Sequence, residues 1–259
     1  MLTAETRTHP GGRPTNEDCV LWDPALSLMA IADGMGGHNA GEVASRLALD
    51  AAREFLRESL TDDVTWAYRR DPELSLAANR LVNAVKLANR EILRAAEGHA
   101  ELSGMGTTLV LGIVEDSRLT FASVGDSRLY ALAGSKLRQL TRDDSWVAML
   151  SAETGVDASL LKKHPMNHVL TSVVGARQDL EVRVQEVDLE DGETLMMCTD
   201  GLHGVLADEV IRRTLEAETD LQQAAERLVQ TALENRSRDN VTVLVARYSS
   251  RESGVGSHD

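Results

Sequence analysis

The stretch Leu28-Met29-Ala30-Ile31-Ala32-Asp33-Gly34 is a short apolar run that ends in an acid and a glycine. Its length and the turn residues around it are typical of a buried β-strand. A carboxylate at the end of such a strand is held rigidly, because its neighbours along the strand are packed in the core. We therefore interpret Asp33 as a positioned acid rather than only a turn residue.

Five further acids lie at the start or end of apolar runs in the same way. Asp126 and Asp200 each follow such a run, whereas Asp239 directly precedes one. Each of them alone is also explained as a turn residue, because Asp-Gly and Asp-Asn pairs are common in turns. A turn does not need an apolar strand beside every acid, so the repetition favours a set of positioned carboxylates. The full set is Glu17, Asp18, Asp33, Asp126, Asp200 and Asp239.

These carboxylates cannot gather as bare charges. Two like charges about 4 Å apart repel by roughly 4 kcal/mol at an effective dielectric constant near 20. A cluster must therefore take up protons or bind cations. Oxygen ligands without cysteine or histidine suit magnesium, manganese or calcium rather than structural zinc. The carbonyl oxygen of Gly34 is a further candidate ligand, because glycine lets the backbone come close to an ion.

Strands and helices are expected in blocks rather than in strict alternation. Two long segments have the apolar spacing of amphipathic helices. One begins near Gly41, and the other runs from Pro72 to Gly98 with Asp71 as its N-cap. Further helices are expected at residues 208–217 and 220–235, and strands at residues 20–22, 27–32, 107–115, 119–124, 128–133, 182–187, 193–198 and 241–248.

This block order predicts an α+β architecture, in which helices pack on antiparallel sheets. Arg118 and Arg128 bracket two neighbouring strands, which we expect to pair as a hairpin. No linker composition interrupts residues 5–247, so residues 1–248 form one predicted domain. The serine- and glycine-rich residues 249–259 form a predicted flexible tail.

Composition excludes several classes of protein. The 259 residues include 27 Lys and Arg against 41 Asp and Glu, a net charge of −14, which argues against a nucleic-acid or anionic-membrane binder. No apolar run reaches the length of a signal peptide or a transmembrane helix. The two cysteines, Cys19 and Cys198, do not make a disulfide framework and are expected to be small buried residues. We therefore predict a cytoplasmic protein.

Six short motifs contain or adjoin the positioned acids. They are residues 13–18 (RPTNED), 32–38 (ADGMGGH), 104–108 (GMGTT), 124–128 (VGDSR), 198–202 (CTDGL) and 237–242 (SRDNVT). Each motif alone is weak, but the ordered set is specific. It resembles the bacterial branch of the protein phosphatase 2C family, the metal-dependent serine/threonine protein phosphatases. The resemblance covers residues 5–247, almost the whole chain.

The resemblance implies a four-layer α-β-β-α sandwich, in which helices flank two central antiparallel sheets and the active site lies at one edge. By motif position, Asp33 would bridge two Mn²⁺ or Mg²⁺ ions, and the carbonyl of Gly34 would bind the first. Asp200 and Asp239 would hold the second ion, and Glu17 would reach it directly or through water.

The remaining roles follow from the same resemblance. Asp126 would help to hold a third metal ion, and Asp18 and Asn240 would support the ligands from behind. Arg13 would grip the substrate phosphate, for which a planar and permanently charged guanidinium is suited.

Such a site implies direct hydrolysis of phosphoserine or phosphothreonine. Two metal ions about 3.5–4 Å apart bridge and acidify a water, so that hydroxide forms at neutral pH and attacks phosphorus in line. The partners that the resemblance implies are phosphorylated proteins and a serine/threonine kinase that the phosphatase opposes, and we expect a monomer. Two alternatives stay open: a non-catalytic phosphoprotein-binding domain, and a phosphohydrolase that acts on small molecules.

The sequence departs from the family pattern at three places. Met35 replaces the histidine of animal members and cannot donate a proton, so the general acid is unassigned and His38 is the residue to test. Asp144 replaces the histidine of the family's Leu-Thr-x-Asp-His-Ser stretch, and Ser172 replaces an arginine. The last two lie beside residues 146–169, which resemble the family's mobile flap, so they bear on flap conformation and substrate choice.

Two other histidines are poor candidates for metal ligands, and a third, His203, could line the site. His164 and His168 are four residues apart, but Pro165 between them interrupts helical geometry. His203 follows Asp200 by three residues and is interpreted as a packed or solvated side chain.

Overall fold

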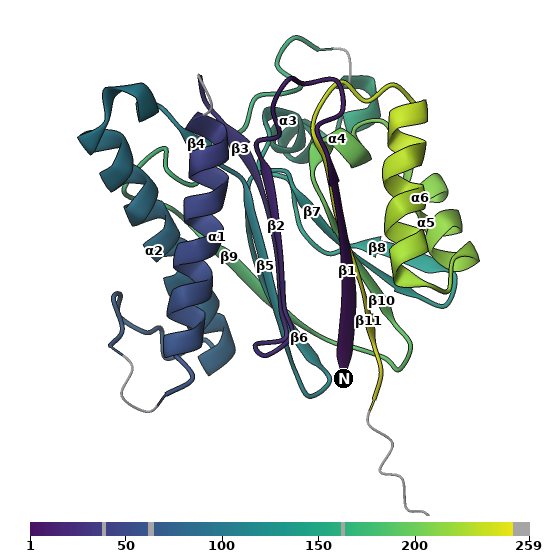
Figure 1. Ribbon diagram of the computed structural model, residues 1–259, viewed down its shortest axis with the longest axis horizontal. Coiled ribbons are helices and arrows are strands. Elements are labelled where there is room, and N and C mark those ends of the chain that lie inside the picture. The colour runs from purple at the N-terminus through teal and green to yellow at the C-terminus, as the bar shows by residue number, and fades with distance from the viewer. Residues whose placement is uncertain (38–39, 62–64, 162–163, 251–259) are drawn as a thin grey trace, which may run out of the picture.

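Two antiparallel β-sheets pack face to face, and helices cover the outer face of each sheet (Figure 1). The computed structural model describes residues 1–37, 40–61, 65–161 and 164–250. One sheet has the order β1 (Leu2–His9), β11 (Val241–Tyr248), β10 (Thr194–Cys198), β7 (Arg128–Ala133) and β8 (Lys136–Gln139). The other has the order β2 (Asp18–Asp23), β3 (Leu28–Met35), β5 (Leu109–Glu115), β6 (Arg118–Val124) and β9 (Arg183–Asp188), and the short β4 (Gly106–Thr107) pairs with β3.

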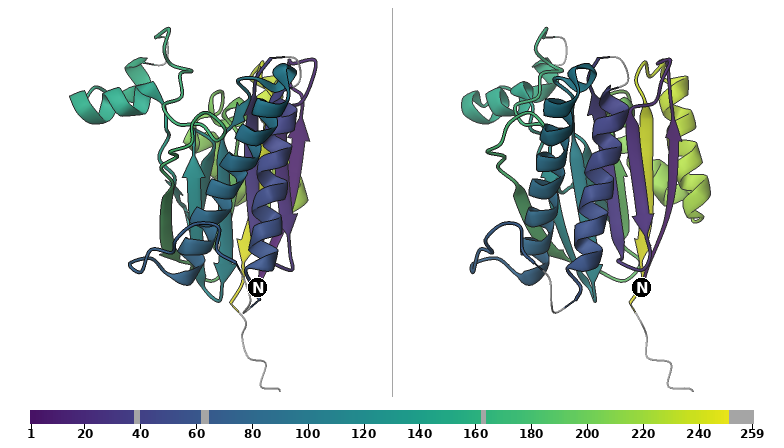
Figure 2. Two further views of the ribbon diagram at one scale, coloured as in Figure 1. Left: turned by 90° about the vertical axis from the view of Figure 1, so that its left-hand side faces the viewer. Right: turned by 60° about the vertical axis from the view of Figure 1, so that its left-hand side comes forward.

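The helices divide between the two sheets, so the predicted four-layer sandwich is confirmed. Helices α1 (Ala40–Glu58) and α2 (Leu76–Gly98) cover the sheet that contains β3. The short α4 (Asp200–His203), α5 (Asp208–Ala217) and α6 (Leu221–Glu234) cover the sheet that contains β1. Helix α3 (Trp146–Thr154) projects from the body and buries none of its residues (Figure 2). Two 3-10 turns, Ala100–Leu102 and Ala158–Leu161, complete the described elements.

Strand β3 shows why these strands have continuous apolar sequences. Each sheet has helices on one face and the other sheet on its second face, so both faces are buried. Leu28 and Ala30 pack with α1 and α2, whereas Met29 and Ile31 pack between the sheets. All four side chains are fully buried, and Asp33 at the end of the strand is therefore anchored by the core.

The predicted hairpin of residues 119–124 and 128–133 is wrong. Strand β6 pairs with β5 and β9, whereas β7 pairs with β10 and β8 in the other sheet. The chain crosses between the sheets over residues 125–127, where Gly125 has a φ of +97° that glycine tolerates. Both strands are buried on both faces, so apolar content alone does not distinguish a hairpin from a crossing.

Helix α2 begins four residues later than predicted. Ser75 is its N-cap, and the Ser75 Oγ accepts a hydrogen bond from the Ala78 N–H at 3.0 Å. The Asp71 carboxylate instead accepts from the Glu73 N–H at 2.9 Å, in a turn before the helix. The buried side chain of Asn79 fixes that turn, because it bonds both the N–H and the carbonyl of Asp71. A local side-chain contact from the first turn of α2 therefore decides between two acceptable N-caps.

The end of the described chain is bonded to the sandwich. The Ser249 N–H donates to the Met1 carbonyl at 2.8 Å, and the Ser250 N–H donates to Asp191 at 2.7 Å. Residues 251–259 lie outside the described residues, so the flexible tail stays a prediction. Among the described helices, none has the length and apolarity that crossing a membrane requires. Both cysteines are free: Cys198 is buried, as expected, and Cys19 is half-buried.

Candidate active site

The predicted acids meet at one end of the sandwich, where several strands from both sheets begin or end. Asp33 lies near the end of β3 and Asp126 follows β6 in one sheet, whereas Asp200 follows β10 and Asp239 precedes β11 in the other. These four acids line a single cavity of about 690 Å³. Four more predicted site residues line the same cavity: Arg13, Glu17, Gly34 and Asn240.

Asp18, the predicted supporting residue, does not line the cavity. It is directly opposite Asp33 in the pairing of β2 with β3. The hydroxyls of Thr199 and Thr242 donate to its Oδ2 at 2.9 and 2.6 Å, while its buried Oδ1 has no partner among the described residues. Burial, opposed by these two hydrogen bonds, raises the pKa of Asp18 to about 7.

Asp33 is held through its backbone by the last residue of β4 and the residue that follows it. Its N–H donates to the Thr108 Oγ1 at 2.9 Å, and its carbonyl accepts from the Thr107 hydroxyl and the Thr108 N–H, each at 2.9 Å. Burial and then the charges of Asp18 and Asp200 raise the pKa of Asp33 well above its ordinary value. The carboxylate is thus rigidly placed among like charges.

Burial and neighbouring negative charges also disfavour the ionised forms of Asp200 and Asp126. The Oδ1 of Asp200 is buried and has no partner among the described residues. Burial and the charge of Asp239 raise the pKa of Asp200, and burial and the charge of Asp200 raise the pKa of Asp126 to about 7. Asp33, Asp126 and Asp200 therefore form a cluster of like charges that must take up protons or bind cations.

Asn240 fastens the loop that carries two predicted site residues, Arg13 and Glu17. Its amide nitrogen donates to the carbonyls of Pro10 at 3.0 Å and Thr15 at 2.8 Å. Its Oδ1 accepts from the Glu17 N–H at 2.8 Å. Asn240 therefore holds the loop in place, and its support of the neighbouring Asp239 stays a prediction.

Gly34 lies where three backbone segments approach closely. Its N–H donates to the Glu17 carbonyl at 3.1 Å. A Cβ at this position would lie 2.0 Å from the Gly41 carbonyl oxygen and 2.7 Å from that of Glu17. Only glycine fits here, and Gly34 is one of the residues that line the acidic cavity.

Arg13 lies at the rim of the cavity beside Asp239. Its Nη2 is 2.8 Å from the Asp239 Oδ2, and the two side chains are 54% and 39% exposed. The hydrogen bond and the charge of Asp239 raise the pKa of Arg13. An arginine has five N–H donors, so most of them stay available to an incoming phosphate.

These residues fit divalent metal ions. The donors are oxygens, and buried carboxylate oxygens of Asp18 and Asp200 lack partners among the described residues. Within the described part of the chain, no three acidic, histidine or cysteine side chains by themselves surround one point. The Gly34 carbonyl and waters would therefore complete the shells, as is usual for Mg²⁺, which keeps several waters.

Several supporting residues were missed from the sequence. Thr108, Thr199 and Thr242 bond the acids, and each lies inside one of the six motifs. His203 is packed rather than solvated: its Nε2 lies 3.0 Å from the Asp126 carbonyl. Burial lowers the pKa of His203 to about 3, so the neutral ring donates this hydrogen bond.

The remaining histidines divide between the cavity and its surroundings. His168 lines the cavity, whereas His164 stacks on Trp146 with ring centroids 4.5 Å apart. His38, the residue to test as a general acid, lies outside the described residues, and Met35 lines the cavity.

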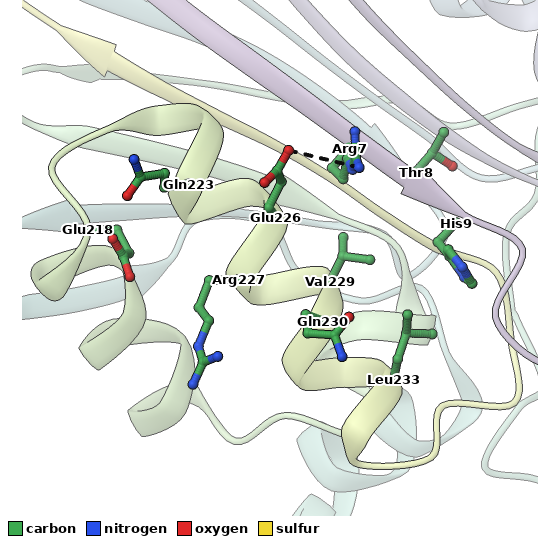
Figure 3. Close-up of a pocket in the computed structure, with 10 residues that line it drawn as sticks. All are labelled: Arg7, Thr8, His9, Glu218, Gln223, Glu226, Arg227, Val229, Gln230 and Leu233. Atoms are coloured by element: carbon green, nitrogen blue, oxygen red, sulfur yellow. Dashed lines mark ion pairs between the residues drawn. The ribbon is translucent and has the colours of Figure 1, made fainter.

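A second cavity, of about 520 Å³, lies between β1 and α6 (Figure 3). Its lining mixes arginines, Arg7 and Arg227, with glutamates, Glu218 and Glu226, and includes none of the predicted site residues. Arg7 pairs with Glu226 at 3.9 Å across it. Its charges are balanced locally, unlike those of the acidic cavity.

The model of the protein phosphatase 2C family matches residues 12–245. The chain belongs to the protein phosphatase 2C family. It is 32% identical to the serine/threonine phosphatase Stp of Listeria monocytogenes over 227 residues, which are 88% of this chain and 86% of that protein. It is 35% identical to the serine/threonine protein phosphatase PstP of Mycobacterium tuberculosis over 234 residues, which are 90% of this chain and 42% of PstP.

Solved structures of the protein phosphatase 2C family have the same sandwich. The crystal structure of M. tuberculosis PstP/Ppp superposes with a TM-score of 0.84 at 32% identity, over 96% of this chain and 99% of that one. The catalytic domain of PstP in complex with two manganese ions superposes with a TM-score of 0.81 at 31% identity, over 96% and 98% of the two chains. The resemblance inferred from the six motifs is therefore confirmed.

Proposed function

We propose that this protein is a metal-dependent serine/threonine protein phosphatase that hydrolyses phosphoserine and phosphothreonine directly. The observation that carries the proposal is the single cavity in which acids from both sheets meet beside an arginine. The family match and the manganese-bound relative support it.

The cavity residues divide into metal ligands and a phosphate-binding group. Asp33 and the Gly34 carbonyl would hold one ion, and Asp200 and Asp239 a second, with Glu17 near it. Two ions bound there supply the acidification of an attacking water and the neutralisation of charge on phosphorus. Arg13 at the rim binds the phosphate and orients it for in-line attack.

Asp126 is the proposed ligand of a third ion. It lines the same cavity as Asp33 and Asp200, and its raised pKa of about 7 reflects the same need for a compensating charge. His203 orients the peptide that carries Asp126 through its carbonyl.

The proposed substrates are phosphorylated proteins, including a serine/threonine kinase and the targets of that kinase. The cytoplasmic location and the monomeric state belong to the same proposal. A phosphohydrolase of small molecules has no separate support in the structure, and a panel of phosphopeptides and phosphorylated metabolites distinguishes the two.

The deciding experiment is phosphate release from a phosphothreonine peptide with Mn²⁺, with Mg²⁺ or with chelator. Asp200→Asn should reduce turnover by at least about 100-fold, the order of loss when a group that acts on transition-state charge is removed. Asp116→Asn is the matched control, because Asp116 lies in the β5–β6 turn with a left-handed φ of 54° that asparagine tolerates. Equal activity of the two folded variants would contradict the proposed site.

A further inference from the structure

Asp144 is a buried acid that holds the crossing loop between the two sheets. Its backbone N–H donates to the Gly125 carbonyl at 2.8 Å, and its Oδ2 accepts from the Gly125 N–H at 3.1 Å. Both polar groups of Gly125 are therefore bonded to one residue. The next residue along the loop is Asp126, the proposed ligand of the third ion.

The same residue joins the two ends of the segment 145–170. The Asp144 carbonyl accepts from the Thr171 N–H at 2.8 Å, and the adjacent Ser145 pairs with Leu170 in an isolated β-bridge. Leu170 lines the catalytic cavity. Asp144 thus connects the crossing loop to the base of the segment that forms part of the cavity wall.

Arg183 of β9 compensates the buried charge of Asp144. Its Nη2 forms an ion pair with the Asp144 Oδ1, and its Nη1 donates to the Arg142 carbonyl at 3.2 Å. The Asp144 side chain is 6% exposed, and a carboxylate this buried needs such a partner. A histidine, as in the family pattern, carries no negative charge to pair with Arg183.

Gly125 transmits the position of Asp144 to Asp126. It has a φ of +97°, and a Cβ on it would lie 2.7 Å from the Thr108 side chain. The loop is confined on the other side by His203, which donates to the Asp126 carbonyl at 3.0 Å. A change in the bonds from Asp144 to Gly125 therefore shifts or loosens Asp126.

We propose that Asp144, paired with Arg183, is a positioning residue that places Asp126 in the cavity and links this placement to the base of the segment 145–170. It acts through Gly125. The inference rests on the proposed function in one respect, namely that Asp126 binds a metal ion.

The test compares Asp144→Asn with Asp23→Asn. Asparagine has one acceptor oxygen where the carboxylate has two, so it cannot serve both Gly125 and Arg183. Asp23 is also buried and pairs with Arg53 at 2.8 Å, but it lies at the opposite end of β2 from Asp18. Both variants lose a buried ion pair, and only the first does so beside Asp126.

Two measurements separate positioning from general stability: calorimetric titration with Mn²⁺, and hydrogen exchange of the backbone amides. We expect Asp144→Asn to weaken the weakest class of Mn²⁺ sites by about tenfold or more, as outer partners of metal ligands do. Exchange should become faster at residues 125–128 and 171. Asp23→Asn should lower the melting temperature without either change. An Asp144→Asn protein that behaves like Asp23→Asn would overturn the proposal.

Arg183→Gln removes the more exposed partner of the ion pair. It replaces Asp144→Asn in these measurements if Asp144→Asn does not fold. It should change the same binding class and the same amides in the same direction, and the double variant should be no worse than the worse single variant. Additive losses would overturn the claim that the pair acts as a unit. A wild-type protein that binds no Mn²⁺ would contradict the proposed function, while exchange at Gly125 would still decide the role of Asp144.

Discussion

At the scale of single residues, the site depends on side chains that bind backbone rather than substrate. Asn240 is the clearest case. Its side chain makes three hydrogen bonds of 2.8–3.0 Å to backbone groups of Pro10, Thr15 and Glu17, in a loop that is not part of a sheet. They add to the contacts that the loop from His9 to Asp18 makes through Arg13, Asn16 and the Glu17 carbonyl. Sequence reasoning placed Asn240 beside the metal ligands but could not show that it fastens this loop.

Asn240→Ala should therefore loosen the loop that carries Arg13 and Glu17. It removes the partners of two carbonyls and one N–H, so we expect the free energy of unfolding to fall by about 2–3 kcal/mol. KM for a phosphopeptide should rise, because Arg13 is no longer positioned. Urea unfolding and steady-state kinetics measure the two effects. Asn235→Ala, at the exposed end of α6, removes a single hydrogen bond, from Nδ2 to the Thr231 carbonyl, and should cost no more than about 1 kcal/mol; equal behaviour of the two variants would refute the role of Asn240.

At the scale of elements, the sequence revealed the strands that are buried on both faces. Strands such as β3 and β10 are apolar throughout, and their ends locate the acids. Strand β1 was missed because it lies at the edge of its sheet: Leu2 and Ala4 face the core, whereas Glu5 and Arg7 are exposed. Helix α3 was missed because it buries nothing and lacks an amphipathic pattern. Sequence patterns thus report burial, and elements without it leave little signal.

Close packing between elements gives a second prediction, at Gly201 in α4. A Cβ on Gly201 would lie 1.9 Å from the Asn240 carbonyl oxygen, so the start of α4 and the start of β11 touch through their backbones. Gly201→Ala should separate Asp200 from Asp239 and reduce stability by about 1–3 kcal/mol, as overpacking does. The stabilisation by Mn²⁺ should shrink as well.

Thermal unfolding with and without Mn²⁺ measures both effects. Gly98→Ala is the control, because a Cβ at this end of α2 meets nothing within 4 Å. It should leave the melting temperature unchanged or slightly raised. A Gly201→Ala protein with a normal response to Mn²⁺ would show that the contact does not position the two acids.

At the scale of the whole molecule, packing the two sheets together brings their acids together. Asp33 belongs to one sheet, and Asp200 and Asp239 flank strands of the other. Sequence reasoning identified these acids and the cation that they require. It did not predict which strands share a sheet, as the wrong hairpin at residues 119–133 shows, because that pairing is decided by the crossing at Gly125. The repulsion among the acids of the cavity therefore arises only when the two sheets pack together.

Because the pKa values of these acids are raised, the stability of the metal-free protein depends on pH. Burial raises the pKa of Asp18 and of Asp126 from 3.8 to about 7. Between these values the native protein binds more protons than the unfolded chain, so its stability falls as pH rises. Each group contributes at most about 1.4 kcal/mol per pH unit in this window. The metal-free protein should therefore be less stable at neutral pH than in mild acid.

Mn²⁺ should reverse this trend, because it binds the deprotonated carboxylates of the native site only. We expect the melting temperature with chelator to fall from about pH 5 to about pH 7, and the increase caused by millimolar Mn²⁺ to grow over the same range. Asp200→Asn removes one of the repelling charges, so its metal-free protein should show a shallower fall than wild type or Asp116→Asn. Melting curves that shift equally with and without Mn²⁺ would mean that the acids of the cavity neither repel one another nor share a cation, and the physical basis of the metal site would be lost.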